Sequence, residues 1–219
     1  MISSSTVSPA DIVHSERELH LRARFETWMR WLMEHPDLHA RFLNTLSLLE
    51  HIGSMKIARS RSGSAITGEI LLHLAEETRH AAYLKKCADK LGVLPGADYR
   101  DEYLLAGAAA RSYFARLDVT VRTFVRERVA PEQWSIASYR LVTWLVERRA
   151  MWLYPAYQSI VEETALRLSV RSIIGEETRH LREIEEGLAE LEIEGLEPLV
   201  REEEKLFARA AETMMARPR

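Results

Sequence analysis

The sequence predicts an all-α fold, and three observations support this prediction. Nine glycines and seven prolines occur among 219 residues, about half of their usual share, so few positions favour turns. Alanine, leucine, glutamate and arginine, which have high helix propensity, are abundant. Apolar residues recur at steps of three and four, the spacing of a helix that buries one face. These features favour long helices over many strands and turns.

Capping signals and helix breakers divide the chain into seven predicted helices. Ser15 and Glu18 form a capping box at the start of the first helix. A turn-rich stretch at 60–68 separates the second helix from the third, and Pro131 separates the fourth from the fifth. Pro155 is expected to bend the fifth helix. The predicted helices cover about 15–35, 37–59, 66–91, 99–129, 133 into the 160s, 168–191 and 197–216.

Composition does not shift along the chain, so we expect one helical domain over 1–219, with 1–13 as a loose tail. Hydrophobic residues make up 47% of the sequence, enough for a sizeable core. The net charge of −3 comes from charges spread along the chain and provides no basic patch for nucleic acid. We find no leader-like start and no stretch of about 18 apolar residues. We therefore expect a cytoplasmic protein with neither nucleic acid nor a membrane as partner.

Cysteine use restricts the kinds of metal site that this chain can form. Cys87 is the only cysteine of the sequence, which excludes an internal disulfide and any site with several thiolates within one chain. Its apolar neighbours predict a buried, unreactive thiol. A metal ion must therefore be bound through oxygen and nitrogen.

The pentapeptide EETRH occurs twice, one hundred positions apart, and each copy contains the pattern Glu-x-x-His. Residues i and i+3 share a helix face, so Glu77 and His80 can bind one ion together, and so can Glu177 and His180. A single pair of this kind usually lies on a solvated face or makes a local contact. The duplication is what makes a metal site the stronger hypothesis.

Both pairs are expected to face the core, because each lies in a stripe whose members advance by steps of four and three. The first stripe is Ile66, Ile70, His73, Glu77, His80, Leu84, Cys87 and Leu91, and the second is Val170, Ile173, Glu177, His180, Ile184, Gly187 and Leu191. Burial of an unpaired carboxylate costs several kcal/mol. An interior lined by such carboxylates therefore needs cations or another functional reason.

Two more carboxylates occupy core positions on the helices that precede the two motifs. In a helical hairpin, residues at equal distances from the turn lie level with each other. The midpoint between Glu50 and Glu77 falls in the turn-rich stretch, and that between Glu147 and Glu177 falls at Glu162, where turn signals are weak. We therefore expect four carboxylates and two imidazoles to meet at one level.

This set of residues resembles the ligands of the ferritin-like superfamily, whose di-iron and di-manganese members take Glu from two helices and Glu-x-x-His from two others. The resemblance covers about residues 37–191, including a long crossover that here contains its own helix. It implies a ferritin-like four-helix bundle with additional N- and C-terminal helices. It also implies two iron ions, or alternatively manganese or a mixed Mn/Fe pair. By this resemblance the bridging carboxylates are Glu77 and Glu177, the terminal ones Glu50 and Glu147, and the imidazole ligands His80 and His180.

The remaining residues of EETRH are similar to an element in hydroxylase subunits of bacterial multicomponent monooxygenases. That likeness implies that Glu76 accepts a hydrogen bond from a metal-bound histidine and pairs with Arg179, and that Glu176 and Arg79 form the mirror pair. His73 lies on the same stripe as the first motif. Two interpretations of it stay open, a third imidazole ligand or a hydrogen-bonded core histidine.

The resemblance implies a non-haem di-iron oxidase or oxygenase that uses O₂ to oxidise a small organic substrate, with an electron donor and a homodimer left open. We expect Gly53, Trp144, Ala150 and Met151 to line the substrate pocket, since they flank the terminal carboxylates. No catalytic residue beyond the metal centre is identified. A ferroxidase or iron-handling protein is the alternative, and a partner-binding bundle with vestigial ligands is a third hypothesis. The run 201–205 is expected to be a solvated helix face.

Overall fold

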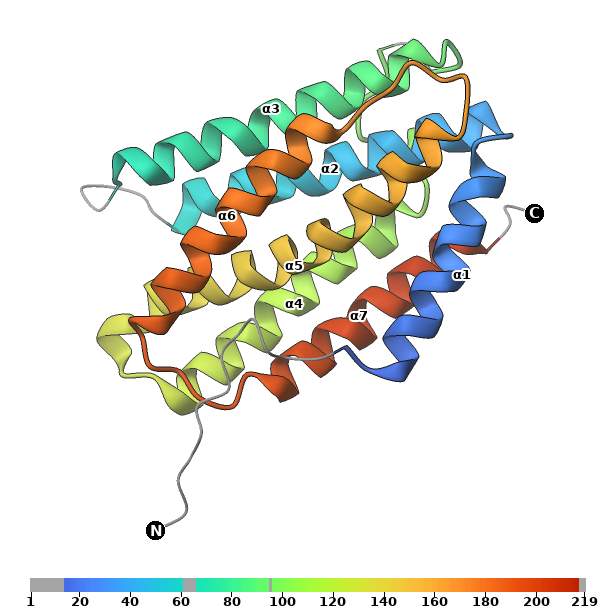
Figure 1. Ribbon diagram of the computed structural model, residues 1–219. Coiled ribbons are helices and arrows are strands. Elements are labelled where there is room, and N and C mark those ends of the chain that lie inside the picture. The colour runs from blue at the N-terminus through green and yellow to red at the C-terminus, as the bar shows by residue number, and fades with distance from the viewer. Residues whose placement is uncertain (1–13, 61–65, 95, 217–219) are drawn as a thin grey trace.

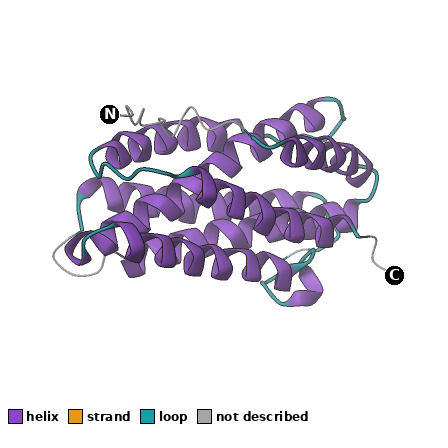
Figure 2. Ribbon diagram, turned by 90° about the horizontal axis from the view of Figure 1, so that it is seen from below, coloured by secondary structure: helices purple, strands orange, loops and turns teal. Residues whose placement is uncertain are grey.

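The computed structural model describes residues 14–60, 66–94 and 96–216, in which all regular structure is helical (Figure 1, Figure 2). Within these ranges the α-helices are α1 (Glu16–Leu32), α2 (Pro36–Ser60), α3 (Gly68–Lys90), α4 (Gly107–Arg128), α5 (Trp134–Glu162), α6 (Arg171–Ala189) and α7 (Glu197–Met215), with short 3-10 turns at Asp101–Tyr103 and Pro131–Gln133. The all-α prediction is confirmed. The expected loose tail at 1–13 and the centre of the predicted turn, 61–65, lie outside the described residues.

Two antiparallel helix pairs, α2 with α3 and α5 with α6, contain the predicted ligands (Figure 1). In the first pair, the Ser47 hydroxyl donates to the carbonyl of Ala81 at 2.6 Å. In the second pair, the Gln158 side chain accepts from the backbone N–H of Val170, also at 2.6 Å. α5 ends at Glu162 and α6 begins at Arg171, so the second hairpin turns a few residues beyond the predicted midpoint.

The remaining three helices cover the other side of α5. α4 packs against α5 and α7, and α1 packs against the same two helices. α4 belongs to the long connection between α3 and α5, as the crossover predicts. Buried apolar residues of all seven described helices join one hydrophobic core. Within the described ranges, no helix combines the length and apolar character that crossing a bilayer requires.

The helix predicted over 99–129 starts later, with α4. The loop that precedes α4 is bonded to side chains of α2. Asn44 donates to the carbonyl oxygens of Asp98 and Tyr103 at 2.8 and 2.9 Å, and Thr45 accepts from a backbone N–H of the same loop at 2.8 Å. These bonds use backbone groups that a first helical turn would need. The helix prediction is therefore wrong for this segment.

Buried charges attach α1 and α7 to α5. Arg149 of α5 donates to Glu203 of α7 through Nε at 3.1 Å and Nη2 at 2.7 Å, and it also donates to Glu18 of α1. Tyr113 of α4 donates to Glu203 at 2.7 Å. Glu203 is 4% exposed and the adjacent Glu204 is 7% exposed. The predicted solvated face of α7 is wrong at these two positions, because they bind groups of other helices.

The start of α1 uses half of the predicted capping box. The Ser15 hydroxyl accepts from the backbone N–H of Glu18 at 3.1 Å, as predicted. The Glu18 side chain does not return to the Ser15 N–H but binds Arg22 and Arg149. Glu204 accepts from the Ser15 N–H instead, at 3.3 Å. The buried guanidinium of Arg149 requires a carboxylate, and this demand redirects Glu18.

Candidate metal centre

Seven side chains from four helices meet in the interior between the two helix pairs. They are the six ligands that the resemblance implies, together with His73: Glu50 of α2, His73, Glu77 and His80 of α3, Glu147 of α5, and Glu177 and His180 of α6. Six of them are buried and Glu50 is half-buried. The structure therefore brings the whole predicted set together.

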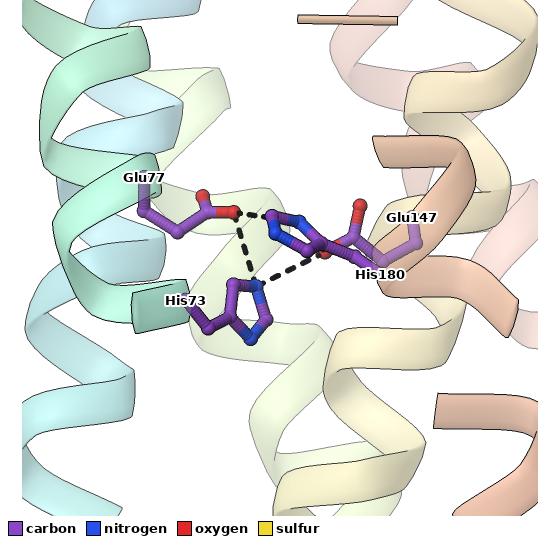
Figure 3. A group of neighbouring side chains, drawn as sticks. All are labelled: His73, Glu77, Glu147 and His180. Carbon is purple, nitrogen blue, oxygen red and sulfur yellow. Dashed lines mark hydrogen bonds and ion pairs between the residues drawn. The ribbon is translucent and has the colours of Figure 1, made fainter. Parts of the chain in front are cut away.

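The seven residues form two overlapping groups, each able to hold a metal ion. Within each group, one ligand atom from every residue lies within 4.8 Å of the others. The first group is His73, Glu77, Glu147 and His180 (Figure 3), and the second is Glu50, Glu77, His80 and Glu177. Glu77 belongs to both. Adjoining groups with a common carboxylate are the arrangement of dinuclear carboxylate sites.

In the first group, two histidines face the same two carboxylates (Figure 3). His73 Nε2 lies 3.1 Å from Glu77 Oε1 and 3.5 Å from Glu147 Oε1. His180 Nδ1 lies 3.7 and 3.8 Å from the same two oxygens. His73 also bonds to the Tyr139 hydroxyl at 3.1 Å through Nδ1. His73 is thus a hydrogen-bonded buried histidine and also lies among the predicted ligands. The two interpretations of this residue, a core histidine and a third imidazole ligand, each agree with part of its surroundings.

In the second group, Glu177 extends to the histidines of both motifs. Its Oε1 lies 3.0 Å from His80 Nδ1, and its Oε2 lies 3.3 Å from His180 Nδ1. Glu50 Oε2 lies 3.9 Å from His80 Nδ1, and the other Glu50 oxygen accepts from the Tyr154 hydroxyl. These positions suit a bridging role for Glu177 and a terminal role for Glu50.

Each of the three imidazoles is bonded through one nitrogen to an outer partner and turns the other toward the carboxylates. The outer contacts are His80 Nε2 to Glu176 at 2.7 Å, His180 Nε2 to Glu76 at 2.8 Å and His73 Nδ1 to Tyr139 at 3.1 Å. His80 Nδ1 is buried and has no hydrogen-bond partner among the described residues. This nitrogen faces the carboxylate oxygens of Glu177 and Glu50, and a divalent ion such as iron or manganese that displaces its proton would fit among them.

The cross pairing of the two EETRH copies is present as predicted. Arg179 donates to Glu76, and Arg79 donates to Glu176 at 2.7 Å. Each of these glutamates also binds the histidine of the opposite motif. An Arg–Glu–His chain therefore connects the surface to the interior on both sides, and the rings are fixed by groups that do not belong to the ligand set.

A double-mutant cycle with Glu76→Gln and Arg179→Ala tests this pairing. We expect a coupling energy of about 1–3 kcal/mol, because Glu76 is buried and also binds His180. Urea titration of the metal-free chain gives the free energy of unfolding for each variant. Arg182 and Glu186, an exposed pair on α6, provide the control cycle, with an expected coupling of about 0–0.5 kcal/mol. Equal coupling in the two cycles would contradict the pairing.

Burial and the neighbouring carboxylates shift the pKa values of the site. Burial, together with the charges of Glu50 and Glu177, raises the pKa of Glu77 well above its usual value. Burial and the charge of Glu177 do the same to the pKa of Glu147. Burial disfavours the charged form of His80, but the carboxylates of Glu177 and Glu50 outweigh it and raise the pKa of His80 to about 10. The site therefore retains protons that bound cations would displace.

His73 has the opposite shift. Burial, followed by the positive charge of His180, lowers the pKa of His73 to about 3. The ring is therefore neutral near pH 7, which is the form of imidazole that binds metals.

A cavity of about 600 Å³ extends to the first ligand group. Its inner end is lined by His73, Glu77 and Glu147, together with Gly53 of α2. A Cβ atom at Gly53 would lie 3.2 Å from Glu77 Oε2. The glycine therefore leaves space for this carboxylate, and its predicted place in the pocket is confirmed.

Two of the expected pocket residues lie elsewhere. Trp144 is fully buried and its Nε1 donates to Glu185 of α6 at 3.3 Å, and Met151 also contacts α6. Ala150 lines a smaller cavity of about 70 Å³ beside Glu50. The pocket prediction is wrong for Trp144 and Met151, because α5 directs them toward α6 whereas the large cavity lies between α5, α2 and α4.

The charged residues at the outer end of the large cavity were not predicted from the sequence. Lys56 and Arg59 of α2 and Arg122 and Arg126 of α4 line it, with Asp118 between them. On α4, Asp118, Arg122 and Arg126 are spaced four residues apart, which indicates one charged face of that helix. The sequence does not show that α2 lies opposite this face, so the cavity could not be predicted.

Comparisons of the chain with known protein families, with curated proteins and with solved structures find no match. The structure itself defines the class of protein: a helical chain whose described part contains buried groups of glutamate and histidine that can hold metal ions.

Proposed function

We propose that this chain is a dinuclear metal protein of the ferritin-like kind that uses O₂ to oxidise a small organic substrate. The observation that supports this most is the pair of ligand groups with Glu77 in common. Four carboxylates provide the negative charge that two divalent cations neutralise. Carboxylate and imidazole ligands in this ratio are typical of di-iron and di-manganese sites.

The ligand groups indicate how two ions would be held. One ion would be bound by His73, His180 and Glu147 and the other by His80 and Glu50, with Glu77 and Glu177 common to both. The helices α2, α3, α5 and α6 would be the four members of a ferritin-like bundle, with α4 in its crossover. Bound iron would supply the redox chemistry that O₂ requires, and manganese or a mixed pair fits the same ligands.

The chain's own residues would orient the ligands and surround the substrate. Glu76 and Glu176 accept from the Nε2 atoms of His180 and His80 and thereby fix both rings. The Tyr154 hydroxyl holds one oxygen of Glu50. Apolar side chains such as Val142 and Val146 line the large cavity next to the ligands and would surround the substrate there.

The outer end of the cavity disfavours the alternative of iron handling. Lys56, Arg59, Arg122 and Arg126 outnumber Asp118 among the charged residues there. This excess positive charge repels Fe²⁺ on its way to the site and attracts anions. An organic substrate therefore suits the cavity better than iron as cargo.

Anaerobic loading with Fe(II), followed by exposure to O₂, tests the proposal. We expect about two iron ions per chain to remain bound, and O₂ uptake to stop after one round when no reductant is present. A ferroxidase would instead oxidise many equivalents of added Fe(II) and form a large hollow assembly, which size-exclusion chromatography detects. Failure to retain iron would overturn the proposal.

Metal binding is expected to release protons, because the raised pKa values of Glu77, Glu147 and His80 keep protons at the site near pH 7. Titration calorimetry with Mn(II), in two buffers of different ionisation enthalpy, should show release of about one to two protons per chain. A proton count of zero would be inconsistent with binding at these residues.

The same shifts predict how the stability of the metal-free chain depends on pH. The pKa of His80 rises from 6.5 to about 10 on folding, so its stabilising contribution is complete below pH 6.5 and is lost as the pH approaches 10. The Tm should fall across this window. In His80→Gln the Tm should depend less on pH across this window. An unchanged dependence of Tm on pH in this variant would contradict the raised pKa of His80.

A further inference from the structure

We propose that the large cavity binds an organic anion with an apolar body, with its charged end at Lys56, Arg59, Arg122 and Arg126 and its apolar end at the metal ligands. This inference specifies the substrate class of the proposed oxidation and in that respect rests on the proposed function.

The cavity is long, and its two ends differ in charge. On α5 its lining extends from Trp134 at the outer end to Glu147 at the inner end, a separation of about 20 Å along a helix. On α4 the lining extends from Arg126, which is exposed, to Phe114, which is buried. A ligand with one charged end and an extended body matches this gradient.

The middle of the cavity is mainly apolar. Ile52 of α2, Phe114 of α4 and Val142 and Val146 of α5 contribute to its walls. Apolar ligand surface that leaves water here contributes about 25 cal/mol per Å². The walls therefore favour a hydrocarbon or aromatic body over a sugar or another highly polar molecule.

At the outer end, two of the four cations are committed to a carboxylate of the protein. Asp118 lies 3.0 Å from Lys56 Nζ and 3.0 Å from Arg122 Nη2. Arg59 and Arg126 have no carboxylate within ion-pair distance in the described part of the chain, and Arg126 lies over the Trp134 ring at 5.7 Å. Two guanidinium groups are thus placed to bind an anion, for which their planar donors are suited.

The difference between the inner and outer ends fixes the orientation of such a ligand. Glu77 and Glu147 line the inner end as candidate metal ligands, next to apolar walls. The cationic side chains that could pair with a ligand carboxylate, Arg59 and Arg126, lie at the outer end of the cavity, so the carboxylate is favoured there. The carbon atoms farthest from the carboxylate then lie nearest the metal ligands.

Calorimetric binding of octanoate, decanoate and dodecanoate, each compared with its primary alcohol, tests the proposal on the full chain with and without Mn(II). We expect each carboxylate to bind about tenfold or more tightly than its alcohol, as one charge-assisted contact predicts. Affinity should increase with chain length and fall as salt is added. Equal binding of acids and alcohols, or no binding of any acid, would overturn the proposal.

Variants identify the binding surface. The double variant Arg59→Ala/Arg126→Ala should bind acids and alcohols with equal affinity, and it leaves no protein carboxylate unpaired. Ser138→Trp fills the cavity and should weaken the binding of acids and of alcohols to the same extent. Arg116→Ala removes a charge from α4 outside the cavity and should change nothing. An equal effect of Arg116→Ala would refute the site.

The binding measurement separates this inference from the proposed function. If the chain prefers carboxylates to alcohols but retains no iron, the anion-binding site is supported and the proposed oxidation of a substrate is wrong. If the chain retains two irons and consumes O₂ but binds no acid, the proposed function stands and its substrate class is wrong.

Discussion

Glu77→Ala is expected to abolish the binding of both metal ions. Glu77 is the residue common to the two ligand groups, so its loss removes a carboxylate from each site at once. After anaerobic loading with Fe(II), elemental analysis should find about two ions per unaltered chain and close to none in the variant. Glu177→Ala should have a similar effect, because its two oxygens face His80 and His180 separately.

The stability of the variant distinguishes a metal site from a structural ion-pair cluster. Burial raises the pKa of Glu77, so its carboxyl group destabilises the metal-free fold as the pH rises. Metal-free Glu77→Ala should therefore be as stable as the unaltered chain or more stable. Glu186→Ala, an exposed change on α6, should leave metal content unchanged. Two ions in Glu77→Ala would refute the assignment of the ligands.

The ligand set could be predicted from the sequence because its signals are local. An i, i+3 pair needs only one helix, and the duplicate EETRH identifies both such helices. Glu50 and Glu147 required one further step, the equal distances of paired residues from a hairpin turn. The structure confirms that these helices pair and that the side chains meet.

The features that were missed depend on contacts between helices distant in sequence. The cavity forms where α2, α4 and α5 approach each other, and no periodicity of a single helix shows which face of α4 lies toward Lys56 or Arg59. The loop before α4 was predicted as helix because its sequence does not reveal that Asn44 and Thr45 would bind its backbone. The role of His73 stayed open for the same reason, since Glu147 comes from another helix.

The helix α5 has functional side chains on opposite faces. Glu147 faces the ligand groups, whereas Arg149, two residues later, lies about 200° around the helix and binds Glu18 and Glu203. Both faces are buried. The layer of α1, α4 and α7 therefore fixes α5 from the outside, and α5 in turn holds Glu147 at the candidate metal centre.

Arg149→Met is expected to cost about 3–5 kcal/mol of unfolding free energy, the largest effect on stability that we predict for a single substitution. The change leaves two buried carboxylates, Glu18 and Glu203, without their common cation. Urea unfolding of the metal-free protein measures the loss. The triple variant with Glu18→Gln and Glu203→Gln should recover most of it, because neutral amides need no cation. Metal content should be unchanged in both variants, since the Arg149 guanidinium binds Glu18 and Glu203 and none of the candidate ligands. A similar loss in the triple variant would mean that Arg149 acts through packing and not through charge.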